Sequence, residues 1–222
     1  MHISVKSLWH YQDNMITSTA NAQVKNLAQL IKKSKARTEQ GVYIVEGVKM
    51  FQEAPKDEIV KAYISEELYE KGTLKNSLDG ISYEVLKNEV FNHVADTKTP
   101  QGVLCILKQK KYTLDQLTKG EAPLLLVLEN LQDPGNLGTI MRTAEGAGVT
   151  GVILSKDCVD IYNPKVIRST MGSIYRVPHF YAEDLCGVIE QIKEKGINVY
   201  AAALDSSEIY DTYSYKEASA FL

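Results

Sequence analysis

Features that mark several common classes of protein are missing from this chain of 222 residues. No apolar run approaches the roughly 20 residues of a membrane-spanning helix, and the first residues show no signal peptide. The three cysteines form no CxxC pair, which favours a reduced, cytoplasmic chain without disulfides or zinc. The net charge of −3 does not indicate nucleic-acid binding, so the distribution of charge carries more information than its total.

Motifs of several enzyme classes are also missing. The chain has no Walker motif, no HExxH and no GxSxG, and its four histidines do not cluster, so we expect neither a bound metal nor a serine hydrolase. Gly135 and Gly138 do not form GxGxxG, and no acidic residue closes the apolar run that ends at Leu154 as a dinucleotide site requires. A different nucleotide-binding α/β enzyme remains an alternative.

Residues 124–178 contain the clearest pattern in the chain. Apolar runs at 124–128 and 151–154 are typical of strands buried on both faces of a parallel sheet. Between them, residues 133–135 predict a turn, and Asn136 is expected to cap the helix that follows. The apolar face of that helix is expected at Ile140, Ala144 and Ala147, and Gly148 should end it.

The rest of the second domain continues this α/β pattern. Asn163 followed by Pro164 predicts the start of a helix. Further strands are expected at residues 174–177, 197–204 and from 219 onward, with an amphipathic helix at 185–192. We therefore expect an α/β domain with a parallel sheet over residues 123–222.

Residues 16–108 indicate a separate, smaller domain. Four strands, expected at 42–45, 60–64, 81–86 and 103–107, alternate with short helices at 47–54, 66–71 and 88–95, which predicts a compact α/β fold. The polar, lysine-rich residues 109–122 are interpreted as a linker. Residues 1–15 show no sustained period and are interpreted as a dispensable arm, although Trp9 could anchor them.

A basic helix opens the front domain. Its apolar face is predicted at Val24, Leu27, Leu30 and Ile31. Its basic residues are Lys25, Lys32, Lys33, Lys35 and Arg37. Interaction with the helix dipole accounts for two or three cations near a C-terminus. The larger number here predicts a phosphate-binding surface.

Two arginines of the second domain have ordinary structural explanations. Arg142 lies three residues before Glu145, a spacing that allows an ion pair on one helix face. Arg168, with Ser169, would fit a solvated helix face. Spacing alone therefore leaves the roles of both arginines open.

Residues 133–144 closely resemble the first motif of the SpoU-type RNA ribose 2′-O-methyltransferases, in the SPOUT superfamily. Residues 166–178 are similar to the segment that follows that motif in the family. In the front half, residues 16–21, 45–47 and 99–103 resemble the appended substrate-binding domain. The resemblance runs from about Ile16 to Leu222 and includes two long motifs in the right order.

The resemblance implies a fold, a reaction and partners. The family's catalytic domain is an α/β parallel sheet whose C-terminal end forms a trefoil knot, one of the exceptions to unknotted topology. Its members use S-adenosylmethionine, act as homodimers and methylate a ribose 2′-hydroxyl of ribosomal or transfer RNA. The front domain would bind the RNA, and no metal is required.

The resemblance also implies roles for particular residues. Arg142 matches the catalytic arginine; because a guanidinium stays protonated, it would act electrostatically or through an RNA phosphate. Asn136 would orient Arg142 or the ribose. The cofactor-binding residues would be Ala202, Ala203 and Leu204. The RNA-binding residues would be Lys25, Lys32, Lys33, Lys35, Arg37, Arg168 and Ser169.

The chain departs from the family at its end. The second motif, Gly-Asn-Glu-Gly, should start just after Leu222, and the third should follow it. We therefore expect a truncated sequence whose closing knot segment is absent and which is inactive as it stands. A non-catalytic RNA-binding protein of the same fold remains the main alternative, and methyl-donor binding would separate the two.

Overall fold

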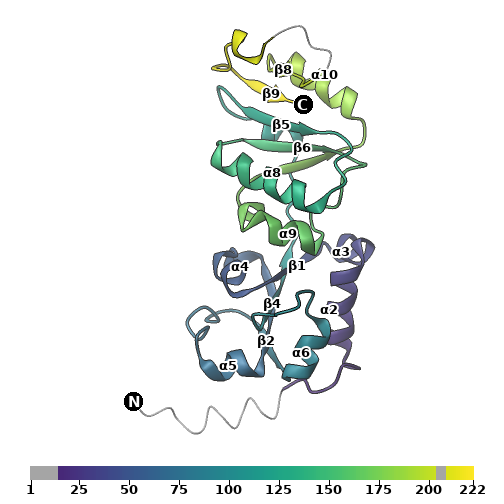
Figure 1. Ribbon diagram of the computed structural model, residues 1–222, viewed down its shortest axis with the longest axis vertical. Helices are drawn as coiled ribbons and strands as arrows, with labels where there is room; N and C mark the ends of the chain where they lie inside the picture. Colours follow the sequence, from purple (N-terminus) through teal and green to yellow (C-terminus); the bar gives the residue numbers. More distant parts are fainter. Residues whose placement is uncertain (1–14, 204–208) are drawn as a thin grey trace. The chain divides into compact units, whose positions relative to one another are not determined.

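The computed structural model describes residues 15–203 and 209–222 and divides the chain into two compact units (Figure 1). The first comprises Met1–Gln109 with Tyr162–Pro164, and the second comprises Lys110–Ile161 with Lys165–Leu222. The division falls one residue beyond the predicted domain boundary at 108. Residues 1–14 of the predicted arm, which include Trp9, lie outside the described residues. Leu204 lies outside them as well.

A mixed four-stranded sheet forms the centre of the first unit, in the order β1-β4-β2-β3. Strand β4 pairs antiparallel with β1 and with β2, whereas β3 pairs parallel with β2. The four predicted strands are confirmed, with small shifts of their ends. Their bounds are Val42–Glu46 (β1), Ile59–Ser65 (β2), Tyr83–Leu86 (β3) and Val103–Lys108 (β4).

Helices pack against both faces of this sheet, which explains why β1 and β4 are apolar without alternation. The helices are α2 (Ala22–Lys32), α3 (Ser34–Gln40), α4 (Val48–Glu53), α5 (Glu66–Lys71) and α6 (Asn88–Val94), with a 3₁₀ turn, η1, at Lys56–Glu58. The predicted apolar face of α2 is buried together with Val42 and Ile44 of β1. Between them, Tyr43 and Val45 are also buried, and α4 packs against β1 and β4.

The second unit contains a five-stranded sheet in the order β7-β6-β5-β9-β8, and every neighbouring pair is parallel. The bounds are Leu124–Leu128 (β5), Gly151–Ser155 (β6), His179–Ala182 (β7), Asn198–Tyr200 (β8) and Ser219–Phe221 (β9). The strand predicted from residue 219 is confirmed, and it lies inside the sheet between β5 and β8. The predicted strand 197–204 is shorter, since β8 covers only three residues.

Three helices connect these strands: α8 (Pro134–Gly146), α9 (Pro164–Thr170) and α10 (Leu185–Glu194). The strand predicted at 174–177 was wrong. Gly172 adopts a left-handed conformation with φ 98° and begins a 3₁₀ turn, η2, at Ser173–Tyr175. Val177 N–H then donates to Ser173 C=O at 2.9 Å, which continues the turn. Strand β7 therefore starts only after Pro178.

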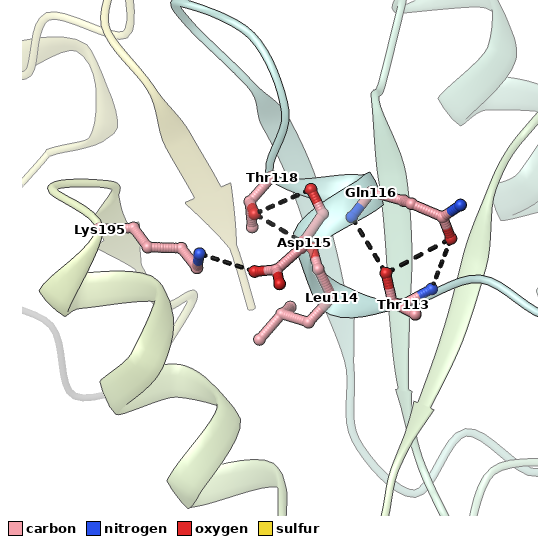
Figure 2. Close-up of polar contacts among 6 residues, drawn as sticks. All are labelled: Thr113, Leu114, Asp115, Gln116, Thr118 and Lys195. Atoms are coloured by element: carbon pink, nitrogen blue, oxygen red, sulfur yellow. Dashed lines mark hydrogen bonds and ion pairs between the residues drawn. The ribbon is translucent and has the colours of Figure 1, made fainter.

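The segment predicted to be a linker folds as part of the second unit. It contains a one-turn helix, α7 (Leu114–Leu117), whose N-cap Thr113 forms a reciprocal capping box with Gln116 (Figure 2). Asp115 forms an ion pair with Lys195 at the end of α10, at 2.8 Å (Figure 2). Leu117 is fully buried in the core formed by β5, β6 and α10. A Cβ built on Gly151 would lie 2.2 Å from Leu117 Cγ, so the absence of a side chain there accommodates Leu117.

Within residues 15–203 and 209–222, several features are not found. No helix there combines the length and apolar character that a membrane span needs. No group of three or more His, Cys, Asp or Glu side chains in these residues could hold a metal ion. The thiols of Cys105 and Cys158 are free and buried, and that of Cys186 is free and exposed.

The buried leucine of α7 gives a direct test of the linker interpretation. Leu117→Ala should lower the free energy of unfolding by about 2–5 kcal/mol, because it opens a cavity in a closed core. Asp115→Ala, which breaks an exposed ion pair, should change it little. Urea unfolding followed by circular dichroism would measure both. Equal, negligible effects of the two substitutions would show that residues 109–122 are only a spacer.

Candidate active site

The loop between β5 and α8 presents the first motif. Asp133, rather than Asn136, caps α8: its Oδ1 accepts a hydrogen bond from Asn136 N–H at 2.7 Å. Pro134 occupies the first helical position, where its missing N–H costs nothing and its fixed φ suits the helix. The predicted cap was therefore wrong by one turn, and Asn136 lies within the first turn of the helix with an exposed side chain.

The buried face of α8 also differs from the prediction. Its buried residues are Leu137, Gly138, Met141 and Ala144. Ile140 is only partly buried and Ala147 is exposed. Leu137, Met141 and Ala144 recur at i, i+4 and i+7, so they form one stripe, which shares only Ala144 with the predicted stripe.

Gly138 brings α8 and α9 into close contact. A Cβ at this position would lie 2.2 Å from Ser169 Cβ and 2.9 Å from both Ser169 C and Val166 O. No side chain larger than hydrogen fits there without moving the backbone of α9. The two motifs noted in the sequence therefore meet at this contact. Ser169, predicted to bind RNA, is partly buried against α8, and its hydroxyl donates to Lys165 C=O at 2.9 Å.

Arg142 is exposed on α8. The alternative of an Arg142–Glu145 ion pair is contradicted, because the Glu145 carboxylate instead binds Arg176, with Nη2 to Oε2 at 3.3 Å. Among the residues that the structure describes, Arg142 takes part in no hydrogen bond or ion pair. Its guanidinium therefore keeps all its donors for a ligand. Arg168, predicted to contact RNA, is partly buried on α9.

Asn136 does not support Arg142 directly. The two residues are six positions apart on α8, which is about 9 Å along the axis and about 120° around it. No hydrogen bond joins their side chains within the described part of the chain. Of the two roles predicted for Asn136, contact with the ribose fits this geometry better than orientation of Arg142.

The predicted cofactor residues Ala202 and Ala203 follow β8, and both are exposed. Ala202 N–H donates to Leu222 C=O at 3.0 Å, so they lie beside the end of β9, which pairs with β5. Within the sheet, β6 and β7 lie on one side of β5, and β9 and β8 lie on its other side. Ligands of open α/β sheets bind at the carboxyl ends of the strands at such a switch point.

A pocket of about 870 Å³ lies at the carboxyl ends of β5, β6 and β7. Four of its lining residues are acidic: Glu129, Asp157, Glu183 and Asp184. Lys156 is the one basic side chain in its lining. The pocket is therefore unsuited to RNA phosphates, and it lies on the other side of β5 from Ala202. Sequence reasoning missed it, although an acidic residue stands within two positions of the end of each of these three strands.

The basic residues predicted on the first unit divide into two groups. Lys25, Lys32 and Lys33 are exposed and form no ion pair within the described ranges, and Lys35 pairs with Glu39 at 3.7 Å. Arg37 was wrongly assigned to this surface. Its side chain is 2% exposed, and Nη1 donates to the C=O groups of Leu30 (2.8 Å) and Ile31 (3.3 Å). It satisfies carbonyls at the end of α2, which have no partner within the helix.

Fold and candidate site together define a two-unit α/β protein whose second unit has a parallel sheet with a pocket at the carboxyl ends of its strands. The model of the SpoU rRNA Methylase family matches residues 123–222, and that of the MRM3-like substrate binding domain matches residues 21–105. The 23S rRNA (guanosine(2553)-2′-O)-methyltransferase RlmP of Bacillus subtilis is 31% identical over 93% of this chain and 80% of its own length. The human mitochondrial rRNA methyltransferase 3 is 35% identical over 70% of this chain and 39% of its own length.

Solved structures agree with these matches. An AdoMet-bound rRNA methyltransferase from Sinorhizobium meliloti superposes with a TM-score of 0.80 and 28% identity, covering 93% of this chain and 79% of that one. AviRb from Streptomyces viridochromogenes, also with AdoMet, shares the fold, with a TM-score of 0.78 and 19% identity over 90% of this chain and 80% of that one. The chain belongs to the SpoU rRNA methylase family, the S-adenosylmethionine-dependent RNA 2′-O-methyltransferases. The alternative of a non-catalytic RNA-binding protein is not favoured by these relatives.

The contact at Gly138 gives a test of the site's construction. Gly138→Ala should destabilise the protein by about 1–3 kcal/mol, because the added methyl group overlaps the α9 backbone. Gly146→Ala is the matched control, since a Cβ there meets nothing within 4 Å and Ala is the better helix former by up to about 1 kcal/mol. Thermal unfolding of both variants compares them. Equal melting temperatures would contradict the close helix contact.

Proposed function

We propose that this protein transfers a methyl group to a ribose 2′-hydroxyl of large-subunit ribosomal RNA, with Arg142 beside the reacting hydroxyl. The observation that carries this proposal is the exposed Arg142 with no protein partner in the described chain, on a helix fixed by close packing against α9. The choice of ribosomal over transfer RNA is supported by the B. subtilis relative, whose name specifies 23S rRNA.

The reaction needs positioning more than proton chemistry. S-adenosylmethionine supplies an electrophilic methyl carbon, and the ribose oxygen must approach it in line to about 3–3.5 Å. A ribose hydroxyl is a weak acid, so a fixed positive charge stabilises the alkoxide character that develops on it. Arg142 provides that charge without losing its own proton. The hydroxyl proton passes to solvent or to an RNA phosphate.

Neighbouring residues would hold the two substrates. Asn136, exposed in the first turn of α8, is positioned to contact the ribose. Arg168 would bind a phosphate of the same RNA segment through the two parallel donors of its guanidinium. Ala202, Ala203 and Leu204 would line the cofactor site. Ser169, by contrast, supports this site by its contact with Gly138.

The first unit would bind RNA outside the reacting nucleotide. Its exposed lysines Lys25, Lys32 and Lys33 lie on α2 and at its end, and Lys35 adds a charge that Glu39 partly neutralises. Such cations bind phosphates and release counterions, which gives affinity without base specificity. The acidic pocket of the second unit would keep the phosphate backbone away from the ends of β6 and β7.

We further propose that the protein acts as a homodimer in the cytoplasm. The dimer is what the family resemblance implies. The cytoplasm is where a bacterial relative such as that of B. subtilis meets its ribosomal RNA.

Arg142→Ala in the full-length protein should lower the rate of methyl transfer by about 10²–10³, the usual cost of losing one preorganised donor. The melting temperature should change little, because Arg142 is exposed and Ala favours helix. Arg142→Lys should recover only part of the rate, since an ammonium lacks the planar fork. Transfer of tritiated methyl groups to unmodified 23S, 16S and transfer RNA transcripts measures the rate and the choice of RNA. More than half of the wild-type turnover in Arg142→Ala would rule out the catalytic role.

Replacing Lys25, Lys32 and Lys33 together by Ala should weaken RNA binding and flatten its salt dependence. The slope of log K against the logarithm of the salt concentration should become shallower by about 0.7–0.9 for each phosphate that the variant no longer neutralises. Lys71→Ala on α5 is the control, because Lys71 forms an ion pair with Glu67 at 2.6 Å. Filter binding to the same transcripts at several salt concentrations gives the slopes. An unchanged slope in the triple variant would exclude this surface.

A further inference from the structure

We propose that Ser155, the last residue of β6, and Cys158, from the turn that follows it, are positioning residues for methyl transfer. They hold residues 129–133, the loop that starts α8, in one conformation and thereby fix where Arg142 stands. The inference rests on the proposed function of Arg142.

Both side chains bind the backbone of that loop. Asn130 N–H donates to Ser155 Oγ at 2.9 Å. Leu131 N–H donates to Cys158 Sγ at 3.3 Å, and the Cys158 thiol donates to Leu128 C=O at 3.3 Å. Ser155 and Cys158 thus bind three backbone groups within four residues at the end of β5. Two of these groups, the N–H groups of Asn130 and Leu131, lie beyond Leu128, the last residue of β5 that pairs with β6.

The side chains of Ser155 and Cys158 also contact each other. Ser155 Oγ and Cys158 Sγ are 3.5 Å apart. With the thiol proton of Cys158 donated to Leu128 C=O, the Ser155 hydroxyl is free to donate to Cys158 Sγ. Each polar hydrogen then has one acceptor, so removing either side chain leaves a partly enclosed backbone group without its partner.

The loop needs this support because of its conformation. Asn130 has φ 49°, in the left-handed region that residues other than glycine rarely adopt. Leu131 C=O is held as well, by Val159 N–H at 2.8 Å. Gln132 Nε2 donates to Asp157 C=O and to Asn130 Oδ1. The two loops are therefore joined at successive residues.

The loop after β6 is itself fixed from β7. The Tyr181 hydroxyl donates to Val159 C=O at 2.8 Å and accepts from Ile161 N–H at 2.9 Å. Burial raises the pKa of Tyr181, so its hydroxyl stays protonated. A rigid connection thus runs from β7 through Tyr181 and the Ser155–Cys158 pair to the start of α8.

A small change at the start of α8 is amplified at Arg142. Nine residues separate Asp133 from Arg142, which is about 14 Å along the helix axis. A tilt of about 10° at the cap would move the backbone of Arg142 by about 2 Å over that length. Misplacement of a catalytic group by about 1 Å can cost a factor of about 10² in rate.

Cys105 shows what an ordinary buried cysteine looks like in this protein. It is fully buried in β4, and its thiol has one weak contact, to Ile106 C=O at 3.9 Å. Cys158 is 8% exposed and has three polar partners at 3.5 Å or less. Replacing each cysteine by Ala therefore separates the effect of lost packing, expected at both sites, from the effect of a misplaced Arg142, expected only at Cys158.

Cys158→Ala, Ser155→Ala, Cys158→Ser and the control Cys105→Ala would be assayed in the full-length protein on an unmodified 23S rRNA transcript. The folded fraction would be measured by circular dichroism at the assay temperature. Per folded molecule, Cys158→Ala should lower kcat by at least about ten-fold with little change in KM, as expected for a misplaced catalytic group. Cys158→Ser, which keeps a donor and an acceptor, should recover much of kcat. Cys105→Ala should keep the wild-type kcat.

A double variant tests the route through Arg142. If Cys158 acts by placing Arg142, the fold-decrease in kcat of Cys158→Ala/Arg142→Lys should be smaller than the product of the two single decreases. Two outcomes would overturn this inference and leave the proposed function standing. One is a decrease in kcat of the double variant that equals the product of the two single decreases. The other is a wild-type kcat in folded Cys158→Ala when Arg142→Ala is slow. Wild-type turnover in Arg142→Ala would overturn the proposed function and, with it, the inference.

Discussion

The missing side chain at Gly138 is the constraint on which the second unit's site depends. Because α8 approaches the backbone of α9 with no Cβ between them, the two motif-bearing segments form one packed pair. That contact fixes the middle of α8, and the capped turn at Asp133 fixes its beginning. An exposed arginine two turns beyond such a start has a defined position although its own side chain contacts nothing in the described chain. Rigidity of the supporting helices thus replaces direct contacts to the functional group.

Much of the fold could be predicted from the sequence. Continuous apolar runs located β1, β4, β5 and β6 within a residue or two, because burial on both faces leaves a signal that needs no partner. Short elements were harder. Residues 174–177 are apolar enough for a strand, but the left-handed Gly172 directs them into a turn. α7 is too short to show a helical period, and the burial of Leu114 and Leu117 in the core shows that the segment belongs to the second unit.

The exposure of the candidate site residues agrees with the sequence prediction only in part. Arg142, Lys25, Lys32 and Lys33 are exposed, as binding would require, and their roles stay predictions. Arg37 belongs to the same basic cluster in sequence, yet it folds inward onto the carbonyls of α2, because a helix end needs donors that composition does not reveal. Pro134 directly follows Asp133 and occupies the first position of α8, so Asp133 rather than Asn136 is the N-cap. The acidic pocket escaped notice because its residues come from three strands far apart in sequence.

The position of β9 has a consequence for biosynthesis. It is the last of the described strands along the chain, yet it lies between β5 and β8, and β8 pairs with no other strand in the described structure. During translation, β5 to β7 can assemble early, whereas β8 must wait for residues 219–221 before it joins the sheet. Such late, long-range parallel pairing is slow. The last strand of the first unit ends at residue 108, so that unit can fold well before β8 and β9 pair. The edge that carries Ala202 therefore joins the described sheet after β5, β6 and β7 have paired.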